Sequence, residues 1–193
     1  MSILAYTLKA GGIACETFDP SVIEENPMRA CDAAAAERMM TKVAELKERE
    51  DSMGGVVECR ISGVATGLGE PVFDKLDAAL AHAMLSIGSI KGIELGAGFE
   101  VAEMTGSEHN DQMSSQGFIT NNAGGIVGGI STGEEIVFRV AVKPTSSIAK
   151  PQKTIDLEGN ERVIRTEGRH DACICPRIVP VVEAMACLVL EDH

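Results

Sequence analysis

Two short polar stretches carry the residue types best suited to chemistry. The first is Gly168-Arg169-His170-Asp171, and the second is Lys143-Pro144-Thr145-Ser146-Ser147. A fixed cation beside a carboxylate can hold an anion and move a proton, and an ammonium beside three hydroxyls can neutralise a phosphate. The functional site is therefore expected at these two stretches.

Composition limits the partners that this protein can have. The chain has 193 residues, 45% of them apolar, which suits one globular domain or two small ones. Its formal net charge of −12 argues against nucleic acid or an anionic membrane as partner, because both require a basic face. An anionic ligand would have to meet a local cluster of Lys and Arg.

Neither a membrane anchor nor a disulfide framework is expected. No apolar run reaches the length that spans a membrane, and Ser2 to Gly12 lacks the apolar centre of a signal peptide, so the cytoplasm is the expected location. The six cysteines show no paired CxxC spacing and are interpreted as reduced thiols. With five Phe, one Tyr and no Trp, platforms that stack nucleobases are not expected.

The hydrophobic pattern predicts an α+β fold, with helices and antiparallel strands but no regular βαβ alternation. Residues 96–122 are predicted to be loop-like. The predicted strands are Ile3 to Leu8, Val57 to Ile61 and Ile136 to Val140. The predicted helices run from an N-cap at Asp32 to about Arg49, from Phe73 to Ile87, where Gly88 and Gly92 end the helix, and from Val181 to Leu190.

Five linked motifs resemble those of the chorismate synthase family. They occur in the family's order and cover nearly the whole chain, which makes them far more specific than a single glycine pattern. The motifs are Gly67 to Asp77, Ser86-Ile87 with Lys91-Gly92, Asn121 to Gly129, Lys143 to Ile148, and Gly168 to Met185.

This resemblance implies a fold, an activity and a cofactor. The family packs long helices against antiparallel β-sheet and assembles as homotetramers. Its members are lyases of the shikimate pathway, in aromatic amino-acid biosynthesis. They convert 5-enolpyruvylshikimate 3-phosphate to chorismate by loss of phosphate and a ring proton. They need reduced FMN, although no net oxidation occurs.

Residues 1–193 resemble only the C-terminal half of this family. The family's N-terminal half carries a Ser-His-Gly motif, a second active-site histidine, arginines that hold the substrate and NADP, and an Arg-Ser-Ser stretch at the flavin. None of these is present in the sequence. We therefore expect this chain alone to be inactive.

The resemblance gives roles to two residues of the first stretch. Asp171 matches the family's aspartate that assists proton transfer at the flavin N5, and a carboxylate beside Arg169 stays ionised until a ligand desolvates it. Arg169 matches a ligand-binding position, where its guanidinium can hold a phosphate or a flavin carbonyl. The alternative is an ion pair between Arg169 and Asp171 that stabilises a loop. His170 is expected to be solvated or structural.

The remaining matches concern the cofactor. Gly128 matches a flavin contact, where a side chain would block close approach, and is otherwise a bulge or a tight turn. Gly88 and Ser89 stand where the family often has Asn-Ala, so an amide contact is lost there. Ala172 replaces a usual proline. The FMN-binding segment of the family matches Lys143, Pro144, Thr145, Ser146 and Ser147, which would otherwise be an ordinary exit from a strand.

Three alternative interpretations remain open. His170, Asp171, Cys173 and Cys175 could bind zinc, but structural zinc sites favour two separated pairs of ligands, so no metal is predicted. His82 lies in an apolar helix and is expected to make one hydrogen bond in the core.

Instead of an enzyme, the chain could be a non-catalytic flavin-binding or assembly module whose apolar surface drives self-association.

Overall fold

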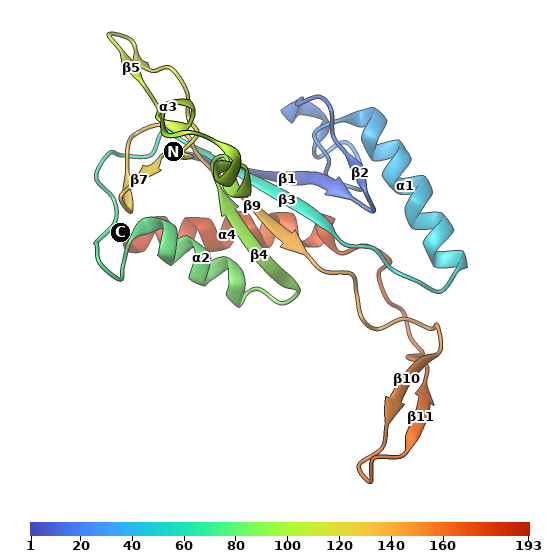
Figure 1. Ribbon diagram of the computed structural model, residues 1–193. Helices are drawn as coiled ribbons and strands as arrows, with labels where there is room; N and C mark the ends of the chain where they lie inside the picture. Colours follow the sequence, from blue (N-terminus) through green and yellow to red (C-terminus); the bar gives the residue numbers. More distant parts are fainter.

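One antiparallel sheet organises the α+β fold of residues 1–193 in the computed structural model (Figure 1). Its strands follow the order β2-β1-β3-β9-β4, and each neighbouring pair is antiparallel. The sequence correctly predicted β1, β3 and β9, the last two from their alternating pattern. The strands are β1 (Ser2–Ala10), β2 (Ile13–Ala14), β3 (Gly55–Ser62), β4 (Ile90–Leu95) and β9 (Ile136–Val142).

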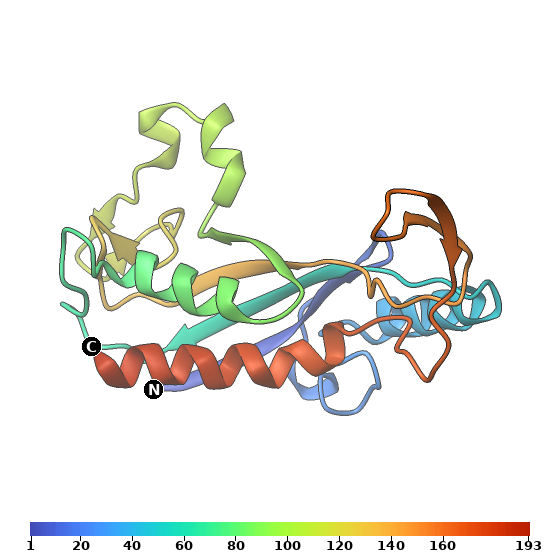
Figure 2. The ribbon, with the colours of Figure 1, turned by 90° about the horizontal axis from the view of Figure 1, so that it is seen from below.

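Two helices cover one face of this sheet, so the predicted packing of long helices on antiparallel strands is confirmed (Figure 2). Leu80 and Met84 of α2 and Val182 of α4 meet Val57 and Phe138 in one buried cluster. Each such side chain contributes about 1.5–3 kcal/mol when it leaves water. None of the helices combines the length and apolar character that a membrane crossing requires. The helices are α1 (Ala33–Glu48), α2 (Leu76–Ser86), α3 (Gly106–His109) and α4 (Cys175–Asp192).

The start of α4 was predicted wrongly. The helix begins at Cys175 rather than Val181, and Pro180 lies inside it. A proline removes one helical hydrogen bond, which is why the sequence favoured a start after it. In the structure Pro180 is exposed, whereas Ile178 and Val179 beside it are buried against the sheet. This packing outweighs the lost hydrogen bond.

The predicted limits of the second helix also need correction. Phe73 precedes α2 and is 88% exposed, so it is not part of a buried helical face. Gly88 follows the end of α2 as predicted, but Gly92 lies within β4, which begins at Ile90. His82 was expected in the core, but it lies on the exposed face of α2. Because only a short turn separates α2 from β4, the sequence pattern did not indicate a separate strand there.

Short elements extend from both ends of the sheet. The stretch predicted to be loop-like contains η2, α3, β5 and β6, while β10 and β11 form a hairpin that projects away from the body (Figures 1 and 2). All residues of both hairpin strands are exposed. The elements are η1 (Pro20–Val22), η2 (Gly98–Glu103), β5 (Met113–Ser114), β6 (Gly117–Phe118), β7 (Ile126–Val127), β8 (Ile130–Ser131), β10 (Gln152–Ile155) and β11 (Glu161–Ile164).

The other face of the sheet holds a buried carboxylate that joins several strands. Glu58 of β3 accepts hydrogen bonds from the Tyr6 hydroxyl, from Arg60 Nε at 3.0 Å and from Arg139 Nε at 2.6 Å. Burial alone would raise the pKa of Glu58, but the bonds from Tyr6 and Arg139 outweigh it and lower the pKa overall. The paired charge favours one register of β1, β3 and β9, because a slip by one residue would turn Glu58 to the apolar face.

The predicted N-cap of α1 gives a stability test. The Asp32 carboxylate accepts hydrogen bonds from the backbone of Ala35, Glu16 and Thr17, which lower its pKa to about 2. We expect Asp32→Ala to cost about 1–2 kcal/mol of unfolding free energy at pH 7, measured by urea denaturation. The wild-type advantage should shrink as the pH falls from about 4, the unfolded pKa, towards 2.

The control for this test is Asp19→Ala. Asp19 caps only the three-residue η1 and accepts from Ser21 alone. Equal losses in the two variants at pH 7 would contradict the assigned role of Asp32.

Candidate functional site

Strand pairing brings several chain segments to one end of the sheet. Gly55 at the start of β3 and Ile90 at the start of β4 both pair with Val142 at the end of β9. In an antiparallel sheet the start of one strand lies beside the end of its neighbour. The segments before β3, before β4 and after β9 therefore meet. The Lys143 backbone N–H accordingly donates to the Ser89 carbonyl at 2.9 Å.

A cavity of about 160 Å³ lies at this end of the sheet. Three segments line it: the end of α1, the stretch after β9, and the stretch before α4. The two polar stretches expected to form the site meet there in part, through Ser147 on one side and Gly168, His170 and Asp171 on the other. The cavity is not lined by Lys143, Pro144, Thr145, Ser146 or Arg169. The lining residues are Lys47, Glu50, Asp51, Ser52, Ser147, Ile148, Ala149, Gly168, His170, Asp171 and Ala172.

The stretch after β9 presents hydrogen-bond donors without strong partners. Lys143 makes no ion pair, and its Nζ donates only a long hydrogen bond of 3.4 Å to Ser146 Oγ. The Thr145 hydroxyl is buried and has no partner at all. A buried hydroxyl without a partner costs free energy. An incoming acceptor such as a phosphate oxygen would relieve that cost.

Asp171 has a different cationic partner from the one considered from the sequence. Its Oδ2 lies 2.9 Å from Arg177 Nη1 in the first turns of α4, and Arg169 makes no ion pair. The helix turns the Arg177 side chain back towards the preceding loop, six residues away. The interpretation of Arg169 and Asp171 as a mutual ion pair is therefore wrong. Arg169 is exposed and its charge stays available for a ligand.

Gly128 lies apart from the other candidate residues. It forms the turn between β7 and β8, near the start of β9, whereas Lys143 follows the end of that strand. Figure 1 shows β7 at some distance from the stretch that follows β9. Gly128 has a φ of 62° and open space where a side chain would be. The positive φ favours glycine for the turn itself, so its flavin contact stays a prediction.

Several residues that line the cavity were not found from the sequence. Asp51 and Ser52 follow α1, and the Lys150 ammonium at 2.7 Å lowers the pKa of the Asp51 carboxyl. A short polar turn after a helix is too common in proteins to indicate a binding site. Only the pairing of β3 with β9 shows that this turn faces Ser147.

The donor set fits a phosphate group better than a metal ion. No group of three or more His, Cys, Asp or Glu side chains is arranged to hold a metal. Lys143, Thr145, Ser146 and Ser147 offer an ammonium and hydroxyls, which suit the phosphate of FMN. At about 160 Å³ the cavity is smaller than the roughly 300–1,000 Å³ of pockets that enclose whole cofactors. The cavity is thus too small for an entire flavin, and of these four residues only Ser147 lines it.

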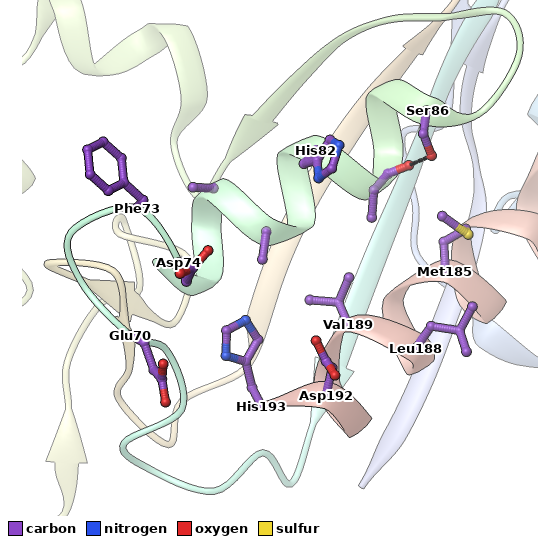
Figure 3. A pocket seen from close by; sticks show the side chains of 13 residues that line it. Glu70, Phe73, Asp74, His82, Ser86, Met185, Leu188, Val189, Asp192 and His193 are labelled. Carbon is purple, nitrogen blue, oxygen red and sulfur yellow. Dashed lines mark hydrogen bonds between the residues drawn. The ribbon is translucent and has the colours of Figure 1, made fainter.

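A larger hollow lies elsewhere, as a groove of about 880 Å³ between α2 and α4 (Figure 3). Ala79 and Ala83 line it from α2, and Leu188 and Val189 line it from α4. Leu188 is 65% exposed, so the groove leaves apolar surface in water. Acidic and imidazole groups lie at one end of it. None of the residues expected to carry chemistry lines this groove.

Comparisons with known proteins agree with the sequence motifs. The family model described as chorismate synthase matches residues 1–193. The chorismate synthase of Desulfosudis oleivorans is 52% identical over 193 residues, which are all of this chain and 54% of that protein. The chorismate synthase of Roseiflexus castenholzii is 52% identical over 198 aligned residues, covering all of this chain and 55% of that protein.

A solved structure gives the same result for the fold. A chain titled "Crystal Structure of Chorismate Synthase" superposes with a TM-score of 0.79 at 29% identity, covering 99% of this chain and 56% of that one. The chain thus spans about half the length of the relatives that it matches.

The ion pair at the site can be tested by double-mutant cycles. We expect Asp171→Asn and Arg177→Gln to show a coupling energy of about 0.2–1 kcal/mol in urea unfolding, because the Arg177 side chain is largely exposed and that of Asp171 is partly exposed. Asp171→Asn combined with Arg169→Gln is the matched control and should show no coupling. Coupling of Asp171 to Arg169 alone would mean that the loop adopts another arrangement.

Proposed function

Because this chain belongs to the chorismate synthase family, we propose that it is the C-terminal half of an FMN-dependent lyase. The reaction is the elimination of phosphate from 5-enolpyruvylshikimate 3-phosphate to give chorismate, in the shikimate pathway. The meeting of Ser147 and Asp171 in one cavity carries this proposal. Segments distant in the sequence and suited to phosphate binding and proton transfer lie side by side.

The segment from Lys143 to Ser147 would hold the phosphate of FMN. Its ammonium neutralises the charge, and the hydroxyls of Thr145, Ser146 and Ser147 donate to the phosphate oxygens. Because Lys143 makes no ion pair, it can bind the phosphate without first losing a partner. The unpartnered Thr145 hydroxyl gains its missing partner. Arg169, also free of an ion pair, would bind a second anionic or carbonyl oxygen of the cofactor or the substrate.

Asp171 would act in proton transfer. Arg177 contacts Oδ2 and leaves Oδ1 with no hydrogen-bond partner, so Oδ1 can take up a proton. Arg177 holds the carboxylate in place at the edge of the cavity, where it can accept a proton from a bound ligand. Bound reduced FMN supplies electron density to a reaction that involves no net oxidation.

The remaining half of the enzyme would complete both the site and the core. The small cavity supports this part of the proposal, because it can enclose only part of a flavin. The exposed apolar groove between α2 and α4 supports it as well, as a face on which further helices can pack. Binding of NADP, assembly as a homotetramer and a cytoplasmic location belong to the same proposal.

A second candidate function rests on the same groove. Exposed apolar residues such as Leu188 could be covered by a second copy of this chain. The protein would then be a non-catalytic flavin-binding or assembly module. Sedimentation separates the two cases, since this module would form dimers or larger assemblies without any other polypeptide.

Flavin binding can be tested with two ligands that differ only by phosphate. We expect Lys143→Ala to weaken FMN binding about 10–100-fold, because a charge-assisted hydrogen bond contributes about 1.5–3 kcal/mol. Binding of riboflavin, which lacks the phosphate, should change little. The measurement is a flavin fluorescence titration. Lys153→Ala, on the exposed hairpin, is the control.

An equal loss for FMN and riboflavin would contradict a phosphate contact by Lys143. If Lys143→Ala weakened neither ligand, this segment would not be the FMN site.

The role of the groove can be tested by adding the other half. We expect the 193-residue chain alone to form no chorismate, and to gain turnover when combined with the unmatched part of the Desulfosudis oleivorans relative. Leu188→Glu should block that association, because it places a charge in the apolar groove. Leu157→Glu, which changes an exposed leucine outside the groove, is the control. Robust turnover by the chain alone would refute the proposal.

A further inference from the structure

The turn after α1 bonds to the stretch after β9 and to Ala172, the residue that follows Asp171. This turn, Asp51 to Met53, is called the α1–β3 turn below. The Ser52 hydroxyl donates to the Thr145 carbonyl at 2.6 Å, and the Met53 N–H donates to the Ala172 carbonyl at 2.7 Å. The Asp51 carboxylate also pairs with Lys150 at 2.7 Å. One short turn thus links two segments that are both far from it in the sequence.

The α1–β3 turn has a well-defined shape. Glu50 ends the helix in the left-handed conformation, with a φ of 55°. Its N–H donates to the Lys47 carbonyl at 3.1 Å, and the Asp51 N–H donates to the Leu46 carbonyl at 2.9 Å. These two bonds close the last turn of α1 in a Schellman motif. They place Asp51 and Ser52 at a set position beyond the helix.

Close packing holds the other side of the turn. A Cβ on Gly54 would lie 3.0 Å from Pro144 Cδ, and closer still to the Val142 carbonyl, so the two backbones approach as only glycine permits. The stretch after β9 is therefore pressed against the start of β3. Within this contact, Ser52 Oγ supplies the one side-chain hydrogen bond to the segment from Lys143 to Ser147.

We propose that Ser52 is a positioning residue that sets the backbone of Thr145 so that the segment from Lys143 to Ser147 is arranged to bind a phosphate group. This inference rests on the proposed function, because it assumes that the segment holds the phosphate of FMN. Ser52 occupies the Thr145 carbonyl and leaves the Thr145 hydroxyl as the unpartnered donor. The ion pair of Asp51 and Lys150 contributes less to this arrangement, because it is partly exposed and screened by salt.

The experiment compares Ser52→Ala with Ser52→Thr in the 193-residue chain. Amide hydrogen exchange of the peptide 143–150 reports the order of the segment, and FMN fluorescence titration reports its affinity. We expect Ser52→Ala to raise exchange in this peptide and to weaken FMN binding about tenfold, the usual effect of one lost hydrogen bond. Ser52→Thr keeps the hydroxyl and should stay within about twofold of wild type.

Thr66→Val is the matched control. Thr66 also donates from a hydroxyl to a distant backbone carbonyl, that of Thr132, at the opposite end of the sheet. It should leave exchange of residues 143–150 and FMN affinity unchanged, even if it lowers the melting temperature. An equal effect of Thr66→Val on both readouts would reduce Ser52 to a general stability role and overturn the proposal.

The remaining outcomes separate this inference from the proposed function. If wild type binds FMN but Ser52→Ala changes neither exchange nor affinity, Ser52 does not position the segment, and the flavin site stands. If wild type binds no FMN, the flavin assignment fails for this chain. Amide hydrogen exchange alone then decides whether Ser52 positions the segment. A rise confined to residues 143–150 in Ser52→Ala then supports positioning, and no rise overturns it.

Discussion

The antiparallel pairing of β3 with β9 is the constraint on which the rest of the structure depends. Residues about 80 positions apart meet in a single register, from Gly55 opposite Val142 to Ile61 opposite Ile136. This pairing sends Val57 and Phe138 to the helices and Glu58 and Arg139 to the other face. It also carries the α1–β3 turn to the stretch that follows β9. The core and the candidate site therefore follow from the same set of backbone hydrogen bonds.

The two cations proposed to bind a ligand, Lys143 and Arg169, have no ion-pair partner. The chain as a whole is acidic, with a net charge of −12. At the cavity, however, the carboxylates of Asp51 and Asp171 are neutralised by Lys150 and Arg177. Lys47 and Glu50, which also line the cavity, make no ion pair, and their opposite charges offset each other there.

Local sequence signals were sufficient wherever one residue type has one dominant physical role. Asp32 caps α1 as expected, since its carboxylate can reach free backbone N–H groups at a helix start. Alternation of apolar residues likewise identified β3 and β9. The same approach failed at β4, which follows α2 too closely for its own pattern to stand out. It also failed at Pro180, because burial of Ile178 and Val179 on the sheet outweighs a local preference.

The sequence by itself determined the α+β class, the main helices and strands, the two polar stretches suited to phosphate and proton chemistry, and the family resemblance. Only the tertiary structure decided that Arg177 rather than Arg169 holds Asp171, that Ser52 holds Thr145, and that Gly128 lies at the far end of the sheet. The reason is physical. Residue type limits what a side chain can do, whereas its partner is selected by strand register and helix packing between segments that are distant along the chain.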